Sequence, residues 1–369
     1  MKTHSPDYPL VVGSTILILL GILILASVSV SFAQEKYGST YYFLKHQIIY
    51  GIIPGLFLGF LAYKFPLSLL KKLAFVFFVV NLIFLALVFA PEIGTKLGGA
   101  ARWVNLGPIS FQPSEFLKLT FILYLAAWMA SRTKKAGSVK IRKDVSATLI
   151  AFMISTGLVS LFLIFQPDIS TLGIIVLMGM LIYFFSGAPV WHSMLMILIG
   201  TGGLLVLVKI ASYRFNRLLV FLNPELDPMG IGYQVKQALI AIGSGGIFGL
   251  GLGMSRQKFG FLPQSISDSV FAIFAEETGF IGGAILIILF LFFVWRGFKV
   301  AKSTQDKFLQ LTALGISSWI GIQAFINIGA MIGILPLTGI PLPFVSFGGS
   351  HIITEFVGLG ILLNISKNI

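Results

Sequence analysis

Long runs of apolar residues restrict most strongly how this chain can fold. The first run, from Leu10 to Ala33, contains no charged residue. It is long enough for a helix that crosses a bilayer, which needs roughly 17–25 residues. It is also well beyond the roughly 7–15 residues of a signal-peptide core. We therefore expect a retained first transmembrane helix rather than a cleaved leader.

The rest of the chain repeats this pattern. Of the 369 residues, 57% are hydrophobic and 11% are charged, whereas an ordinary soluble domain carries roughly 25% charged residues. The chain has no cysteine, which excludes disulfides and Cys-ligated metal sites. We predict an all-α polytopic membrane protein that forms a single domain over residues 1–369. The ten predicted transmembrane helices cover residues 10–32, 46–63, 70–90, 114–131, 145–165, 169–186, 190–210, 269–295, 308–334 and 350–366.

The basic residues indicate how these helices are oriented. One set of short loops carries 15 Lys and Arg residues, six of them in the segment 132–143, and the opposite set carries four. Because short cytoplasmic loops are enriched in Lys and Arg, we expect both termini to be cytoplasmic. The net charge of +13 is then explained by topology and by contact with anionic membrane lipid. We expect no nucleic-acid partner.

Residues 211–268 form the one long predicted loop, which lies between the seventh and eighth helices on the extracytoplasmic side. Within this loop, residues 233–242 have the pattern of a short amphipathic helix in the membrane interface. Arg214 and Arg217 are three residues apart, so a helix would place them on one face.

The same loop contains a glycine-rich segment, 243–264, which includes Arg256 and Lys258. A segment of this kind can cradle phosphate groups with its backbone N–H groups. It can also form a tight bend in which the glycines only permit close packing. The pattern alone does not decide between these two interpretations.

Other ionisable residues are predicted on the same side. We expect Arg102 in a loop, and the three-residue spacing of Glu115 and Lys118 suits an ion pair. Asp168 stands at the start of a helix. The segment 335–351 has too many prolines and glycines for a continuous helix, so we expect a re-entrant or surface loop. Together with the basic residues of the long loop, these groups are expected around one outward cavity.

Asp268 stands where a polar turn gives way to an apolar run, in LPQSISDSVFAIFAEETGF (262–280). Its spacing from Ser265 is that of a capping box, and an acid suits the first turn of a helix. Ionisable groups within membrane segments are costly, however, and by default are functional candidates. The local pattern favours the cap, whereas the surrounding basic residues favour a chemical role. Glu276 and Glu277 are expected to form buried pairs.

Four stretches resemble motifs of the SEDS family of bacterial cell-envelope proteins (shape, elongation, division and sporulation). They occur in family order and span essentially the whole chain. FLKHQIIY and LTGIPLPFVSFGGS look closer to the division branch (FtsW) than to the elongation branch (RodA). The four stretches are AARWVNLGPISFQPSEFLKL (100–119), QPDIS (166–170), the segment 214–263 and LPLTGIPLPFVSFGGS (335–350).

The resemblance implies ten helices and a peptidoglycan glycosyltransferase that polymerises lipid II and releases undecaprenyl pyrophosphate. It also implies a class B penicillin-binding transpeptidase as partner, with other divisome or elongasome membrane proteins. Asp268 matches the aspartate thought essential in the family, and we assign it as general base. The residues expected to bind substrate and pyrophosphate are Arg102, Lys118, Arg214, Arg217, Arg256, Lys258, Ser346, Gly348 and Gly349. Structural roles are expected for Glu115, Asp168, Gln237, Glu276 and Glu277.

The chain departs from the family pattern beside this aspartate. Gln264, Ile266 and Ser267 stand where Glu, His and Thr are usual, and His351 replaces the last serine of GGSS. The neighbours that tune Asp268 are therefore altered. No cofactor is implied with certainty, but a divalent cation (Mg or Mn) could bridge the pyrophosphate to the carboxylate.

Two other functions are compatible with the residues. Broken helices and charges within the membrane also suit a flippase that moves lipid II, and a scaffold could activate its transpeptidase partner without catalysis. The ionisable residues gather near one face, and no internal repeat is apparent, which argues against the transporter. We expect a multi-pass protein of the cytoplasmic (inner) membrane with an outward-facing active site.

Overall fold

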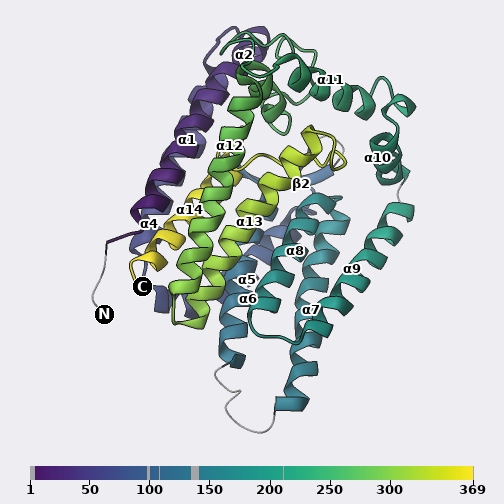
Figure 1. Cartoon of the computed structure of the whole chain (residues 1–369). Helices are drawn as coiled ribbons and strands as arrows, with labels where there is room; N and C mark the ends of the chain where they lie inside the picture. Colours follow the sequence, from purple (N-terminus) through teal and green to yellow (C-terminus); the bar gives the residue numbers. More distant parts are fainter. Residues whose placement is uncertain (1–4, 98–99, 108, 134–140, 211, 369) are drawn as a thin grey trace.

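The chain folds into a bundle of long helices, with short helices and loops at one end (Figure 1). This computed structural model describes residues 5–97, 100–107, 109–133, 141–210 and 212–368. Part of the basic segment predicted over 132–143 lies outside the described residues. The long helices are α1 (Tyr8–Val28), α4 (Ile53–Lys64), α5 (Leu67–Leu87), α6 (Pro113–Thr133), α7 (Ile141–Phe165), α8 (Ile169–Phe185), α9 (Val190–Ile210), α12 (Val270–Ser303), α13 (Lys307–Met331) and α14 (Gly349–Ser366).

Each of the ten predicted segments overlaps one of these long helices. In the described part of the chain, eight helical segments are long and apolar enough to cross a membrane. The two remaining helices are α8, which is shorter at 17 residues, and α6, which carries Glu115, Lys118 and Arg132. The prediction of a mostly helical, multi-pass membrane protein is confirmed.

Both ends of the described chain lie at the same end of the bundle (Figure 1). The backbone N–H of Asp7 donates to Ser366 Oγ at 3.1 Å, and the Asp7 carboxylate pairs with Arg296 of α12. These contacts tie the start of α1 to α12 and to the end of α14. The opposite end of the bundle carries α2 (Val30–Tyr37), α10 (Ser212–Leu222) and α11 (Ile231–Ser244), and we call it the loop end.

The first two predicted helices are each divided into shorter elements. The second one consists of α3 (Tyr42–Gln47), a π-helical turn η1 (Ile48–Ile52) and α4. Pro54 lies in the first turn of α4, where its missing N–H and its ring disturb the regular i→i−4 bonding of the preceding turn. The first predicted helix also ends early, at Val28, and α2 follows it directly.

α12 is interrupted at Gly279, which has φ 68° and ψ −166°. A Cβ atom on this residue would lie 2.3 Å from Gly249 N, so only glycine fits. Backbone bonds then join α12 to the glycine-rich segment: Phe280 N donates to Gly246 O, and Leu250 N donates to Glu276 O. The glycine-rich segment is therefore part of the α12 packing rather than a free loop.

The prediction of an all-α fold is wrong in one place. Residues 94–111, expected as a loop around Arg102, contain a three-stranded antiparallel sheet of order β1-β2-β3. In its register, Thr95 pairs with Trp103 and Asn105 pairs with Ser110. Alternating side chains in a short segment gave too weak a signal beside the apolar helices. The strands are β1 (Gly94–Leu97), β2 (Ala100–Leu106) and β3 (Ile109–Phe111).

The long predicted loop, 211–268, contains regular structure. It holds α10, a 3-10 turn η2 (Pro224–Leu226) and α11. The short helix predicted over 233–242 is confirmed as α11, which is longer by a few residues at its two ends. Asp227 holds the turn that leads into α11, because its carboxylate accepts from Gly230 N at 3.0 Å and Ile231 N at 2.8 Å.

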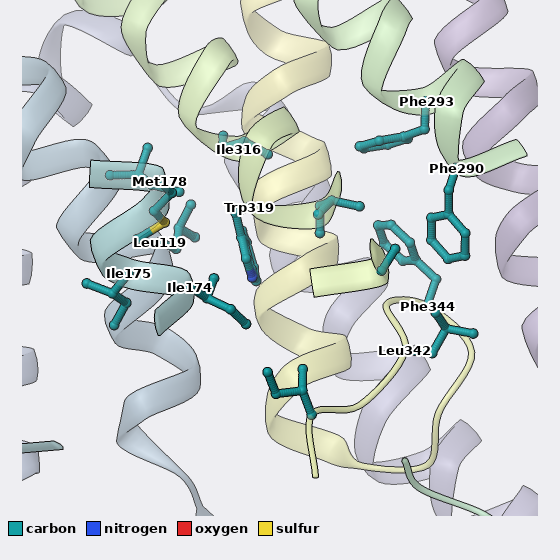
Figure 2. Close-up of a cluster of buried hydrophobic side chains, with 14 of the residues drawn as sticks. Leu119, Ile174, Ile175, Met178, Phe290, Phe293, Ile316, Trp319, Leu342 and Phe344 are labelled. Atoms are coloured by element: carbon teal, nitrogen blue, oxygen red, sulfur yellow. The ribbon is translucent and has the colours of Figure 1, made fainter. Parts of the chain in front are cut away.

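α13 lies at the centre of the packing, and Trp319 on this helix is fully buried. Figure 2 shows the cluster around it, with Leu119 from α6, Met178 from α8, Phe293 from α12 and the irregular segment after α13. Glycines permit the closest helix contacts, as in many membrane bundles. A Cβ atom on Gly360 of α14 would lie 2.1 Å from Gly59 O of α4.

We expect Gly360→Ala to destabilise the protein by about 1–3 kcal/mol, because the added methyl group must push the backbone of α4 away. Gly203→Ala in α9 is the matched control, since nothing lies within 4 Å of its added Cβ. Thermal unfolding of the two variants in detergent gives the comparison. Equal unfolding temperatures for both variants would contradict the close approach of α4 and α14.

Candidate active site

Asp268 lies immediately before α12, at the end of the turn 262–268. The cap position of α12 is Ser269, and no side chain caps the helix there. The Asp268 carboxylate instead accepts a hydrogen bond from Ser267 Oγ at 2.8 Å. The capping-box interpretation is therefore wrong, and the carboxylate is left for another role.

Burial raises the pKa of the Asp268 carboxyl above its ordinary value. The Ser267 hydroxyl, the Gln234 amide and the positive charge of Arg217 act in the opposite direction. Gly339 lies beside the carboxylate, because a Cβ atom on it would be 3.8 Å from Asp268 Oδ2. The side chain thus faces a mixed polar environment formed by α10, α11 and the segment after α13.

The segment after α13, 332–348, is confirmed as irregular, and polar side chains from several helices hold its backbone. Gln323 donates to Pro341 O at 3.0 Å, and Asn327 donates to Ile340 O at 2.7 Å. Further bonds come from Ser170 to Thr338 O, Gln47 to Ser346 O and Arg217 to Leu337 O. Inside a membrane protein, such bonds replace the water that an irregular backbone would otherwise need.

The two arginines of α10 point to different partners. Arg217 Nη1 donates to Leu337 O at 3.3 Å and is close enough to Asp268 to act on its charge. Arg214 Nη1 donates to Leu207 O of α9 at 3.1 Å. The helix that their spacing predicts is present, but only Arg217 is placed beside Asp268.

Arg102 and Asp168 both make hydrogen bonds at the junction of α7 and α8. Arg102, on β2, donates to the carbonyls of Gln166 and Pro167. Asp168 caps α8 by accepting from Thr171 N at 3.3 Å and from Ser114 Oγ at 3.0 Å. This geometry supports the structural role predicted for Asp168.

The ion pair predicted between Glu115 and Lys118 is confirmed at 2.7 Å, and both side chains are buried. Lys118 Nζ also donates to Gln323 Oε1 at 2.8 Å and lies over the Trp319 ring. Its ammonium group is therefore engaged by protein groups on several sides. A role for Lys118 in binding substrate remains a prediction.

A second buried ion pair joins Lys258 to Glu277 at 2.9 Å. The neighbouring Glu276 accepts from the backbone N–H of Arg256 at 3.1 Å and from that of Gln257 at 3.3 Å. The N–H groups expected to cradle phosphate are thus bound to a carboxylate of the chain itself. In this structure, 243–264 is a tight bend, and the side chain of Arg256 is exposed.

Ser346, Gly348 and Gly349 lie just before or at the start of α14 and form part of the chain structure around Asp268. Ser346 is fully buried, Gly348 N donates to Gln47 Oε1 at 2.9 Å, and Gly349 begins α14. Gln237 is half-buried on α11. The glutamine that reaches the Asp268 region is Gln234, one turn earlier, which donates to Ser269 Oγ at 3.0 Å.

Sequence reasoning missed the amides that organise this region: Gln47, Gln234, Gln323 and Asn327. Buried amides in otherwise apolar helices are a usable signal, because each must find hydrogen-bond partners. For metals, the described residues contain no group of three or more His, Asp or Glu side chains able to hold an ion.

Comparison with known proteins places the chain in a family. A family model described as "Cell cycle protein", which covers FtsW, RodA and SpoVE, matches residues 9–369. The chain belongs to the FtsW/RodA/SpoVE family. It is 38% identical to stage V sporulation protein E of Bacillus subtilis, covering 99% of this chain and 98% of the relative. It is 35% identical to the probable peptidoglycan glycosyltransferase FtsW of Coxiella burnetii, covering 98% and 96%.

Solved structures of this family share the fold. One, described as "Structural coordination of polymerization and crosslinking by a peptidoglycan synthase complex", matches with a TM-score of 0.76 at 27% identity, covering 98% of both chains. RodA of Thermus thermophilus matches with a TM-score of 0.70 at 27% identity, covering 98% of this chain and 97% of that one. The overall fold of this chain is therefore shared with these solved structures.

We expect Lys258→Met to destabilise the protein by about 3–5 kcal/mol, because it leaves the buried Glu277 carboxylate unpaired. The double variant Lys258→Met/Glu277→Leu should recover most of that loss. Thermal unfolding in detergent measures both. If the stable double variant then fails to polymerise, Lys258 acts on the substrate; if it polymerises, the pair is structural.

Proposed function

We propose that the protein is a peptidoglycan glycosyltransferase that polymerises lipid II during cell division and releases undecaprenyl pyrophosphate. Membership of the FtsW/RodA/SpoVE family and relatives named as probable peptidoglycan glycosyltransferases support this function. We place the active site at Asp268 because of one observation. Its carboxylate neither caps a helix nor pairs with a buried cation, as Glu115 and Glu277 do.

The proposed topology has ten membrane crossings in a single domain, with both termini in the cytoplasm. The shared position of the two chain ends supports an even number of crossings, and the distribution of Lys and Arg supports the orientation. The loop end, with Asp268 beside it, then faces outward from the cytoplasmic membrane.

In the proposed mechanism, Asp268 takes the proton from the acceptor sugar hydroxyl as that oxygen attacks the anomeric carbon of the donor. The bond between the anomeric carbon and the pyrophosphate oxygen breaks, and displacement in one step inverts that centre. Arg217 lies beside Asp268 and is the best-placed described cation to stabilise the leaving pyrophosphate. Arg256, exposed on the loop, is a second candidate.

Two further components complete the proposal. If a divalent cation takes part, Asp268 would be the protein carboxylate that holds it, and the ion would offset the negative charge of the pyrophosphate. The proposed protein partner is a class B penicillin-binding transpeptidase, because glycan strands must be crosslinked after polymerisation. The related peptidoglycan synthase complex, described as coordinating the two reactions, supports such an assembly.

We expect Asp268→Asn to lower the polymerisation rate by about 10²–10⁴-fold, the usual contribution of a general base. The assay uses purified full-length protein with labelled lipid II in detergent, where no bilayer is present to cross. Glu225→Gln, an exposed carboxylate on the same loop, is the matched control. Polymerisation by Asp268→Asn at the control rate would remove Asp268 as base. Absence of polymer from the wild type, even with the partner, would favour a flippase or scaffold.

The rate should also depend on pH. The base must be ionised, so polymerisation falls as pH decreases through the pKa of Asp268. Because burial raises this pKa above the ordinary value of 3.8, the fall should begin at a higher pH than for an exposed aspartate. Initial rates across the acidic range measure this. An acid limb at the ordinary aspartate value would contradict a buried base.

A further inference from the structure

Two buried side chains hold the backbone on either side of the Asp268 α-carbon. Asn327 of α13, 1% exposed, donates through Nδ2 to Asp268 O at 2.8 Å and to Ile340 O at 2.7 Å. One amide group therefore links the carbonyl after the Asp268 side chain to the irregular segment 332–348. A shift of the Asp268 backbone relative to Ile340 would therefore weaken or break one of the two bonds.

Ser346 holds the carbonyl before Asp268. Its hydroxyl donates to Ser267 O and accepts from Leu342 N, and the next residue, Phe347, donates its N–H to Ile266 O at 2.9 Å. The Ser346 carbonyl is in turn bound by Gln47 Nε2 at 3.3 Å and contacts His351 Nε2 at 3.1 Å. Ser346 is fully buried, so water does not replace these bonds.

Ser267 completes the connection to the carboxylate. Its hydroxyl donates to Asp268 Oδ1 at 2.8 Å, while its carbonyl accepts from Ser346. The two carbonyls that flank the Asp268 α-carbon and one carboxylate oxygen are thus all bonded to side-chain donors. These bonds fix the position from which the carboxylate projects and the direction in which it points.

We propose that Asn327 and Ser346 are positioning residues for Asp268: they act through the backbone of the turn, and Ser267 acts on the carboxylate itself. This inference rests on the proposed function. It gives Ser346 a role different from the substrate contact expected from the sequence, and it adds Asn327. The effect on rate follows from geometry, since a displacement of about 1 Å at a reacting group can cost about 10²-fold.

The chain offers a matched control for Asn327. Asn364, on α14, is also buried, and its Nδ2 also donates to two backbone carbonyls, Ala62 O at 3.0 Å and Phe65 O at 2.7 Å. It lies in the last turn of α14, two residues before Ser366, which accepts from Asp7 N near the start of the chain. Asn→Asp at either position keeps the shape and removes the N–H donors. The loss of stability should therefore be similar, and only the effect on catalysis should differ.

The first experiment measures kcat and KM for lipid II polymerisation, with thermal unfolding in parallel, for Asn327→Asp and Asn364→Asp. We expect kcat to fall about 10²-fold for Asn327→Asp with KM nearly unchanged, because a displaced base affects the transition state and not ground-state binding. For Asn364→Asp we expect both constants near wild type. Equal loss of kcat in the two variants, or wild-type kcat in Asn327→Asp, would overturn the proposal.

Smaller changes test the same connection if Asn327→Asp fails to fold. Ser346→Ala should lower kcat by about tenfold, as loss of one positioning hydrogen bond of about 1.4 kcal/mol predicts. Ser317→Ala, which removes a buried hydroxyl bonded only within α13, should leave kcat unchanged. A Ser346→Ala protein with wild-type kcat would remove Ser346 as a positioning residue.

Ser267 gives a readout that a purely structural role would not produce. Ser267→Ala removes a donor to the carboxylate, so the pKa of Asp268 should rise and the acid limb of the rate should move to higher pH. Ser267→Thr restores the hydroxyl and should restore the limb. An unshifted limb in Ser267→Ala would overturn the inference. Failure of the proposed function is separate, because it appears as polymerisation by Asp268→Asn.

Discussion

The need to satisfy backbone polar groups without water governs this structure. Segment 332–348 leaves helical geometry within the bundle, and each carbonyl that turns away from a helix needs a donor. The donors are side chains of Gln47, Gln323, Asn327 and Ser170. They reach the segment from three different helices, α3, α8 and α13, so its conformation depends on how these helices pack.

The acidic residues are distinguished by the way their charges are neutralised. Glu115 and Glu277 are each paired with a buried lysine, Glu276 accepts backbone N–H groups, and Asp168 caps a helix. Asp268 accepts from a hydroxyl and has an arginine nearby. In the described part of the chain its charge is not paired with a buried lysine, as those of Glu115 and Glu277 are, which suits the proton transfer proposed for it.

Much of the fold follows from the sequence, because apolar runs of membrane length have few alternative structures. The ten helical segments, α11 and the Glu115–Lys118 pair were all predictable from period and spacing. The sheet around Arg102 was not predictable, since short strands give a weak pattern.

The hydrogen bond from Arg256 N to Glu276 could not be predicted from the sequence for another reason. A glycine-rich segment presents N–H groups without showing whether a ligand or the protein itself will accept them. Asn327 was missed, and the positioning role proposed for Ser346 was not anticipated, because their partners are backbone carbonyls, which every residue has.

The interruption of α12 at Gly279 divides that helix into two parts with different attachments. Residues 270–278 follow Asp268 directly, and main-chain bonds link this part and the residues just after the break to the glycine-rich segment at the loop end. The remainder of α12 is packed against α1 and α13 across the membrane bundle. A force applied to the glycine-rich segment is therefore delivered to the short part that follows Asp268, with the long part serving as a fixed support. The glycine-rich segment is thus connected to the Asp268 position mainly through the main chain.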